Sequence, residues 1–529
     1  MPKEKGNGWC YILPMDIEEK RYKEKEGQFS GRPISVWLDT TPETNYKSLP
    51  GDIETETLVI GAGIAGLTTA MLLVEEGKEI VLIDSKRIAS DVTGNTTAKI
   101  TSLHGLIYKE LIEKHGEGKA RLYGEAQQAG LEKIVEIIEK KKIDADLTRE
   151  PAYTYTEKTE NIEKLREEAK AVRKLGLPAS FVRETPFPFM QGAVRFENQA
   201  QFHPRKYLLA MAKLISRKKN CRIYENIRAL DIVENEENIL VKTNKGNIKA
   251  KNVVLATHFP FYDKGRFYAR LSPYRSNVIG VRVRENLPEG MFYSLDDNTH
   301  SFRTQMLKNG RILLVGGEDH PLGDGASNAV KYLRNVRSYA KERFSLRFTE
   351  YYWDNEDYAT ADGLPYIGLS PKSKKIYLAC GFDGWGMTNG TVAGMVISDM
   401  ILGKGNPWVS LFDPSRKDLV KSPGKIFYGG LNFLKSKRPG SVGRKFGLPT
   451  GFQRGEARII EVGGKKVAVY RDKAGEIYKL SPKCTHMGCS VKWNNLEKTW
   501  DCPCHGSRFN YDGKVLHGPA VNDLKEEET

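Results

Sequence analysis

The sequence contains no apolar stretch long enough to cross a membrane. Its longest apolar run, Leu58 to Val74, is interrupted by glycines and threonines, whereas a membrane-spanning helix needs about 20 consecutive apolar residues. The first residues, MPKEKGNGWC, carry charge but neither an apolar core nor a cleavage site, so no signal peptide is expected. These absences predict a cytoplasmic protein without a transmembrane span.

Cysteine is too scarce to form a disulfide framework. Only seven cysteines occur in 529 residues: Cys10, Cys221 and Cys380 are scattered, and the other four lie in one C-terminal stretch. Apolar residues make up 40% and charged residues 28% of the chain, which is typical of globular proteins. The length is sufficient for about two to four domains, each with its own core.

Positive charge is concentrated in one segment. Residues 403–450 hold ten Lys and Arg against two Asp and Glu, a net charge of +8 out of a total of +15. Five prolines interrupt this basic linker. It is either a solvated tether or a weak contact for an acidic partner or a membrane surface. Because no nucleic-acid-binding fold is recognisable, no nucleic-acid partner is expected.

Residues 57–85 follow the pattern of a dinucleotide-binding unit. An apolar strand at 57–60 enters Gly61-Ala62-Gly63-Ile64-Ala65-Gly66, a helix follows until Gly77, and a strand at 80–83 ends at Asp84-Ser85. The glycines let the backbone approach a pyrophosphate at the helix N-terminus, and Asp84 stands where a carboxylate can hold ribose hydroxyls. The pattern predicts an adenine dinucleotide here. No second unit of this kind occurs, which argues against a separate NAD(P)H site.

Later motifs extend this pattern. The hydroxyl-rich run 88–99, which includes Thr96 and Thr97, suits a loop over a diphosphate. A strand at 252–257 ends in Ala256-Thr257, and Asp362-Gly363-Leu364-Pro365 and Gly384-Trp385-Gly386-Met387 follow. With these motifs the chain resembles FAD-dependent oxidoreductases of the D-amino-acid, glycine and sarcosine oxidase family. The resemblance implies that FAD is bound, with residues 256–257 under the flavin and residues 384–387 beside its ring.

The same resemblance implies an α/β fold, with a Rossmann-like FAD-binding domain and an α+β substrate domain. The expected parts are an N-terminal arm at 1–54 and an oxidoreductase domain at 55–402. Its FAD-binding part covers about 55–105, 196–265 and 355–402, and its substrate or cap part covers about 106–195 and 266–354. Residues 106–195, rich in Glu and Lys, predict a helical cap. Period-two alternation from Val278 to Val315, with a turn at Asn309-Gly310, predicts an antiparallel sheet.

One feature of the amino-acid oxidases is missing. Those enzymes usually hold the substrate carboxylate with an arginine just before the Asp-Gly-Leu-Pro segment, and residues 351–358 contain none. Arg275 or Arg303 could supply a replacement from the sheet. Oxidation of amino acids is therefore in doubt, and the catalytic residues stay unknown. Candidate acid–base groups are His203, His258 and His300, although a lone histidine is more often structural.

The C-terminal stretch contains two short loops with matching ligand types. Cys484 and His486 lie in the first loop, and Cys502 and His505 lie in the second. Two thiolates and two imidazoles fit a [2Fe–2S] cluster with one iron held by sulfur and the other by nitrogen. A Cys₂His₂ set can also bind zinc. Zinc fingers, however, usually pair like ligands in sequence and have no use for the two further cysteines, Cys489 and Cys504.

This stretch closely resembles the two ligand boxes of Rieske iron–sulfur proteins. The resemblance implies that Cys484, His486, Cys502 and His505 hold the cluster, that Cys489 and Cys504 form a disulfide, and that Ser507 hydrogen-bonds a cluster sulfur. Where the family often has a tyrosine, this chain has Phe509, and the missing hydroxyl should lower the reduction potential. Short strands at 457–462, 466–471 and 477–480 predict a small all-β Rieske domain at 451–529.

Two redox centres in one chain imply an internal electron path. The favoured hypothesis is that a small substrate of amine or amino-acid type gives a hydride to FAD. Electrons then pass singly through the Rieske cluster to an external one-electron acceptor. One alternative is a reductase in which a donor feeds electrons to FAD through the cluster. Another is a non-catalytic binding module whose basic segment contacts nucleic acid or a membrane.

Overall fold

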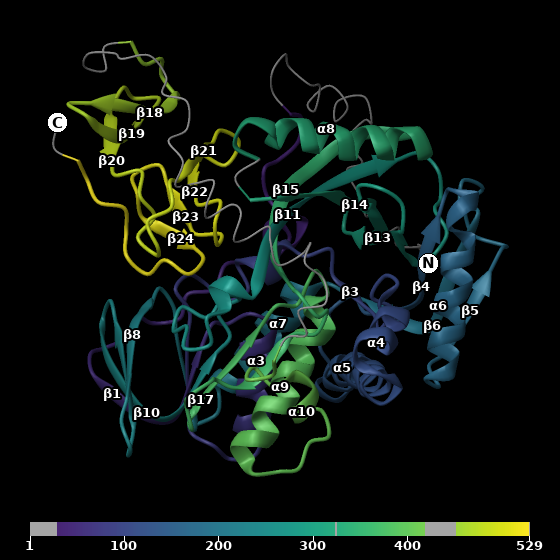
Figure 1. Ribbon diagram of the computed structural model, residues 1–529, viewed down its shortest axis with the longest axis horizontal. Helices are drawn as coiled ribbons and strands as arrows, with labels where there is room; N and C mark the ends of the chain where they lie inside the picture. Colours follow the sequence, from purple (N-terminus) through teal and green to yellow (C-terminus); the bar gives the residue numbers. More distant parts are fainter. Residues whose placement is uncertain (1–28, 323–324, 418–450, 528–529) are drawn as a thin grey trace, which may run out of the picture.

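Two large β-sheets and two small ones organise the chain (Figure 1). The computed structural model describes residues 29–322, 325–417 and 451–527. Of the two large sheets, one is mainly parallel and the other mainly antiparallel, and both belong to the first four-fifths of the chain. The small sheets lie in the C-terminal residues, which Figure 1 draws in yellow beside the ends of β11 and β15.

The parallel sheet contains the predicted dinucleotide unit. Its strand order is β16-β17-β10-β1-β2-β7, and β8 and β9 attach to β10. Strands β7, β2, β1, β10 and β17 run parallel. The strands are β1 Ile53–Ile60, β2 Ile80–Ile83, β7 Cys221–Tyr224, β8 Ala229–Glu234, β9 Ile239–Thr243, β10 Gly246–Leu255, β16 Tyr366–Leu369 and β17 Ile376–Cys380.

Alternation along these strands separates two cores. Val59 and Leu82 point into the core on the helix side, whereas Leu58 and Val81 point into the core on the other side, because successive residues of a strand face opposite ways. The helix side is covered by α3 Ile64–Glu75, α7 Pro204–Ser216 and α9 Gly386–Leu402. The carboxyl ends of β1, β2 and β10 therefore meet at one edge, where ligands of such sheets bind.

The antiparallel sheet confirms the predicted hairpin. Leu307 pairs with Gly310 where β13 turns into β14. The strand order is β15-β11-β14-β13-β12-β4-β6-β3, with β5 beside β6. The strands are β3 Lys99–Ile100, β4 Thr148–Thr156, β5 Ala179–Val182, β6 Gly192–Gln201, β11 Leu271–Val283, β12 Met291–Ser294, β13 Ser301–Leu307, β14 Gly310–Pro321 and β15 Leu346–Thr360. Helix α8 Gly325–Arg343 packs against it.

The prediction of a purely helical cap at 106–195 was incomplete. The segment forms α4 Ile107–His115, α5 Glu117–Lys141 and α6 Ile162–Lys174, but it also contributes β4, β5 and the start of β6 to the antiparallel sheet. Strand β4 was missed because its buried aromatic residues, Tyr153 and Tyr155, lie within a Glu- and Lys-rich composition. Pairing with distant strands, which local sequence does not reveal, fixes it as a strand.

The N-terminal arm supports a loop of the first domain. A short helix, α2 Val36–Asp39, buries Trp37, whose Nε1 donates a hydrogen bond to the carbonyl oxygen of Thr96 at 2.6 Å. The neighbouring turn η1 Val92–Asn95 is held by Ser35, whose hydroxyl donates to the carbonyl of Gly94. The arm thus fixes residues 92–97.

The first part of the expected basic linker belongs to the oxidoreductase body. Helix α10 Val409–Phe412 buries Leu411 and Phe412. Arg416 forms an ion pair with Asp362 at 2.7 Å. The remainder of the segment, residues 418–450 with most of its basic residues, lies outside the described part of the chain.

The C-terminal domain is built from strands, as predicted. One sheet contains β18 Ala457–Val462, β19 Lys465–Arg471 and β20 Ile477–Leu480, and the other contains β21 Lys492–Asn494, β22 Thr499–Asp501, β23 Arg508–Asn510 and β24 Val515–His517. Val491, Trp500 and Phe509 fill its core. Across the residues that the structure describes, no helix is long and apolar enough to span a membrane.

We expect Gly66→Ala to destabilise the protein and weaken retention of the dinucleotide. A Cβ at this position would lie 1.8 Å from the carbonyl oxygen of Gly61, so α3 would have to move away from the glycine loop at a cost of roughly 1–3 kcal/mol. Gly118→Ala, in α5, is the matched control because nothing lies within 4 Å of the added methyl. The unfolding temperature should fall for Gly66→Ala and stay unchanged for Gly118→Ala. Equal shifts in the two variants would contradict the close packing of Gly66 on the glycine loop.

Candidate functional site

Two loops of the C-terminal domain bring two thiols and two imidazoles together. The buried sulfurs of Cys484 and Cys502 hydrogen-bond each other. The rings of His486 and His505 lie 5.0 Å apart between centroids and nearly perpendicular, at 87°. Each ligand pair comes from one loop, so the four predicted ligands converge from the two sides of one site.

Both histidines present an unused nitrogen at this site. The Nδ1 atoms of His486 and His505 are buried and have no hydrogen-bond partner among the described residues. Burial lowers the pKa of each imidazole to about 4, which keeps both rings neutral and their lone pairs available to a metal. Two thiols with two such nitrogens match the ligand set of a Rieske cluster.

The other two cysteines are joined to each other. Cys489 and Cys504 form a disulfide with a Cα–Cα distance of 6.6 Å, which ties the two ligand loops together. The sulfurs of Cys489, Cys502 and Cys504 lie within 4.8 Å of one another. They are not a metal-binding trio, because two of the three are consumed in the disulfide.

The surroundings of the sulfurs can tune such a cluster. The Ser507 hydroxyl and the backbone amides of His486 and Met487 hydrogen-bond the Cys484 sulfur. The amides of Cys504 and His505 do the same for Cys502. Phe509 is completely buried and offers no hydroxyl. Hydrogen bonds to sulfur raise the reduction potential of a cluster, so the phenylalanine removes one such contribution.

A second site lies at the carboxyl edge of the parallel sheet. A cavity of about 180 Å³, here called the dinucleotide cavity, is lined there by residues of the glycine loop, by Asp84 and Ser85 just after β2, and by the start of α9. Twelve of the sixteen predicted flavin-binding residues line it: Gly61, Gly63, Ile64, Ala65, Asp84, Ser85, Thr96, Ala256, Thr257, Gly384, Gly386 and Met387.

The remaining four predicted residues lie close by. Ala62 and Gly66 are packed behind the loop, where the Ala62 amide donates to Asp84 Oδ2 at 2.7 Å. Asp84 therefore holds the glycine loop itself, a role that the sequence did not reveal. Thr97 and Trp385 line a second, adjoining cavity of about 110 Å³, here called the middle cavity. Contact of all sixteen with FAD stays a prediction.

The dinucleotide cavity, the middle cavity and an outer cavity form a connected series. The middle cavity shares Thr96, Asn355, Asp357, Gly384 and Met387 with the dinucleotide cavity. A third cavity, of about 620 Å³ and here called the outer cavity, shares Tyr293 and Trp385 with the middle cavity. A long cofactor with a reactive ring at one end fits the first two, and the third leaves room for a substrate against that ring.

Comparison with known proteins decides the family. Residues 56–400 match the family model "FAD dependent oxidoreductase", and residues 447–527 match "Rieske [2Fe-2S] domain". The chain belongs to the FAD-dependent oxidoreductase family. It binds FAD in its first domain and a [2Fe–2S] cluster in its Rieske domain, as the sequence motifs predicted.

Three similar proteins agree with this assignment. "Putative Rieske 2Fe-2S iron-sulfur protein YhfW" of Bacillus subtilis (strain 168) is 35% identical over 93% of this chain and 97% of its own. Gamma-glutamylputrescine oxidoreductase of Escherichia coli (strain K12) is 23% identical over 68% of this chain and 86% of its own. The crystal structure of L-proline dehydrogenase from P. horikoshii has a TM-score of 0.57 and 20% identity, covering 70% of this chain and 98% of that one, and so shows the fold.

The residues suggested as substrate clamps do not face the outer cavity of the oxidoreductase. Arg303 is fully buried and donates to the carbonyl oxygens of Thr97 and Phe202. Arg275 instead contacts the Rieske domain, with Nη1 2.7 Å from Asp501 Oδ2. Neither arginine lines any of the three cavities described above. Both suggestions were therefore wrong.

The three histidines suggested as acid–base groups do not line the outer cavity either. His203 caps α7 by accepting from the Lys206 amide, and His300 stacks on Tyr339 at 3.8 Å. His258 lines the dinucleotide cavity rather than the outer one. The histidines of the outer cavity are His104 and His320. No sequence motif singled these two out.

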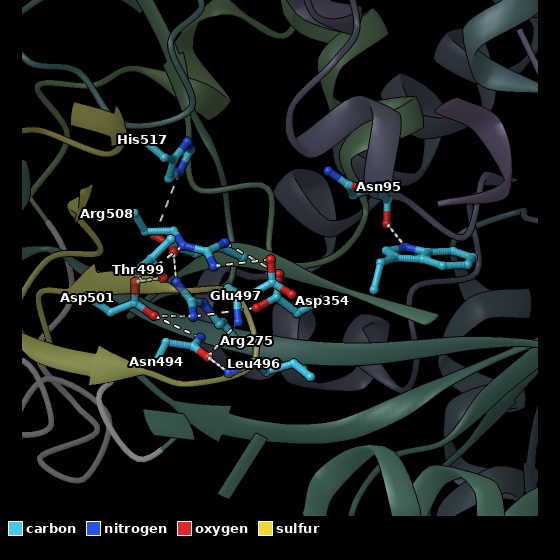
Figure 2. Close-up of polar contacts among 12 residues, drawn as sticks. Asn95, Arg275, Asp354, Asn494, Leu496, Glu497, Thr499, Asp501, Arg508 and His517 are labelled. Carbon is cyan, nitrogen blue, oxygen red and sulfur yellow. Dashed lines mark hydrogen bonds and ion pairs between the residues drawn. The ribbon is translucent and has the colours of Figure 1, made fainter. Parts of the chain in front are cut away.

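A buried ionic cluster, here called the interdomain clamp, joins the two domains (Figure 2). Arg275 of β11 contacts Asp501, and also Glu356 at 3.3 Å and Asp354 at 3.5 Å. Arg508 of the Rieske domain contacts Asp354 at 3.4 Å. Burial alone would raise the pKa of Asp501, but Arg275 and Arg508 hold that pKa far below its ordinary value.

The Rieske domain also completes the wall of the dinucleotide cavity. Leu516, His517, Gly518, Ala520 and Val521 line it. His517 Nδ1 lies 2.9 Å from Asp91 Oδ2 of the flavin domain, and Arg228 donates to the carbonyl of Val515 at 2.7 Å. The sequence of this loop, Gly518-Pro519-Ala520, gives no sign that it reaches the other cofactor's site.

Loss of one thiol should remove the cluster and spare the flavin. We expect Cys502→Ser to lose both iron atoms and the cluster's visible and electron paramagnetic resonance signals, because a hydroxyl is a poor iron ligand. Cys221→Ser, at a buried cysteine far along the chain, should keep them. Iron analysis and flavin absorbance measured on the same samples check this expectation. Retention of the full iron content by Cys502→Ser would contradict the ligand assignment.

Proposed function

We propose that this protein is a flavin-dependent dehydrogenase of a small organic substrate that sends its electrons through its own Rieske cluster to an external one-electron acceptor. FAD supplies the ability to take a hydride, and the cluster carries one electron at a time. Each substrate oxidation therefore reduces two acceptor molecules. The chain's contribution is to place the substrate, the flavin and the cluster in sequence.

The observation that carries this proposal is the orientation of the cluster site. The His486 ring lies 6.2 Å from Phe259, and the His505 ring lies 6.0 Å from Tyr268, both in the flavin domain. The Tyr358 hydroxyl donates to the carbonyl oxygen of His505 at 3.0 Å. The histidine side of a Rieske site is thus directed at the flavoprotein, which supports electron exchange within one chain.

A close backbone approach supports the same docking. Gly506 follows His505 and has a φ of +82°. A Cβ there would lie 1.9 Å from Glu356 Oε1 and 2.5 Å from the Tyr358 hydroxyl. Only glycine lets the second ligand loop lie against β15 in this way. The second ligand loop and β15 therefore fit closely against each other, in addition to the charge pairing of the interdomain clamp.

The interdomain clamp should control the rate of electron exchange. Removing one partner of a buried ion pair costs about 3–5 kcal/mol, since the remaining charges stay buried and unpaired. Arg275→Ala leaves Asp501, Asp354 and Glu356 without this cation. We expect the variant to undock its Rieske domain while it retains FAD and iron. Exchange between the two centres should slow at least tenfold.

A laser flash that generates a reducing radical in anaerobic solution tests this without knowledge of the substrate. Flavin and cluster absorbance are followed separately as the injected electron equilibrates. The native protein should show a phase whose rate does not depend on protein concentration. Arg284→Ala, at an exposed arginine just after β11, is the control that should match it. Absence of that phase in the native protein, or an unchanged rate in Arg275→Ala, would count against the proposal.

A further inference from the structure

One loop of the Rieske domain lies between the two cofactor sites. Residues 516–521, here called the bridging loop, form the part of the dinucleotide cavity wall that this domain supplies. The same loop also packs on the second ligand loop, where the Ala520 amide donates to the Ser507 hydroxyl at 3.1 Å. Ser507 in turn hydrogen-bonds the Cys484 sulfur. The bridging loop is therefore shared by the flavin cavity and the cluster site.

The bridging loop is held rigidly within its own domain. Gly518 has a φ of +92°, and a Cβ there would lie 2.6 Å from the Cα of Ser507, so the two backbones are in close contact. At the base of the loop, the Val515 amide donates to the Asp523 carboxylate at 2.8 Å and joins the two ends. The loop cannot bend away alone, so the cavity opens on this side only when the whole Rieske domain moves.

Two contacts anchor this region to the rim of the dinucleotide cavity. His517 lies 2.9 Å from Asp91, between Nδ1 and Oδ2, and Arg228 donates to the carbonyl oxygen of Val515 at 2.7 Å. Asp91 and Arg228 both line the cavity. His517 Nε2 also lies 3.7 Å from Glu356 Oε1, which connects the anchor to the interdomain clamp (Figure 2). Release of the clamp should therefore release the bridging loop as well.

The other walls of the cavity belong to one folded body. The glycine loop continues into α3, whose apolar residues share a core with α7 and α9. Ser35 and Trp37 hold the neighbouring residues 92–97 in place. Among the described residues that line the cavity, those of the bridging loop alone come from the C-terminal domain. Moving any other wall would disrupt a close-packed core, whereas moving this one needs only undocking.

We propose that the Rieske domain is the gate of the FAD site: FAD enters and leaves the dinucleotide cavity only when this domain is undocked, and His517 is the positioning residue that fixes the gate at the cavity rim. Most of the cavity wall lies in the flavin domain, so the undocked protein still binds FAD. Docking therefore slows entry and exit together and changes the affinity less than either rate.

The rates of FAD entry and exit test the gate. Exit is measured as the loss of tritium-labelled FAD from the holoprotein into excess unlabelled FAD. Entry is measured as the change in flavin fluorescence when FAD is mixed with FAD-depleted protein that keeps its iron. Arg275→Ala removes the cation of the clamp, and Arg275→Glu adds repulsion from the carboxylates around it. We expect both rates to rise at least tenfold in each variant, and the affinity to change less than threefold.

Three further variants separate opening of the gate from loss of a contact. His517→Ala removes the anchor on Asp91 and should raise both rates at least threefold, with the cluster's electron paramagnetic resonance signal unchanged. Asp84→Ala loosens the glycine loop inside the closed cavity, so exit should accelerate while entry stays the same. Lys465→Ala, at an exposed lysine of β19, is the control that should match the native protein in both rates.

The outcomes separate this inference from the proposed function. Faster exit with unchanged entry in the Arg275 variants would reduce the bridging loop to a simple contact of FAD, and unchanged rates in Arg275→Glu would mean that FAD passes elsewhere. Either result overturns the gate and leaves electron exchange between flavin and cluster untouched. Conversely, gated FAD in a native protein that shows no electron exchange after the laser flash would keep the inference and remove the proposed function.

Discussion

The arrangement of the two redox domains depends on a buried cation. Arg275 lies on β11 of the flavin domain, is only 4% exposed, and faces carboxylates from both domains. Burying a guanidinium is costly unless its charge is balanced and its hydrogen bonds are satisfied. Asp354 and Glu356 supply two of its carboxylate partners from the flavin domain, and Asp501 of the Rieske domain supplies the shortest contact, at 2.7 Å. The fold therefore specifies one docked position rather than a loose association through a tether.

This docked position makes the two domains one functional unit. The Rieske residues 516–521 form part of the dinucleotide cavity, and Pro503 and Cys504 reach the outer cavity. His505 is 3% exposed and its imidazole ring lies against Tyr268 of the flavin domain. Met487, next to the other ligand histidine, is 39% exposed. The solvent-facing side of the cluster thus lies at the first ligand loop, which is where an external acceptor can approach.

Local motifs made the two cofactors predictable, because each cofactor imposes its own spacing on the chain. The strand–glycine–helix–strand unit ending at Asp84 and the paired Cys-His loops are such cases. Contacts between distant segments were not predictable. Arg275 was suggested as a substrate clamp because sequence cannot show that Asp501 lies 2.7 Å away. Strand β4 was hidden for the same reason, since its partners, β6 and β12, lie far along the chain.

The direction of electron flow is the central claim, and the two reduction potentials test it most directly. Phe509 removes one hydroxyl from the surroundings of the cluster, which lowers the cluster's potential and narrows its gap to the flavin. A spectroelectrochemical titration of the intact protein resolves both centres in one sample. Flow from FAD to the cluster predicts that the cluster potential lies above that of the flavin. A cluster potential below that of the flavin would contradict the account and favour entry of electrons through the cluster.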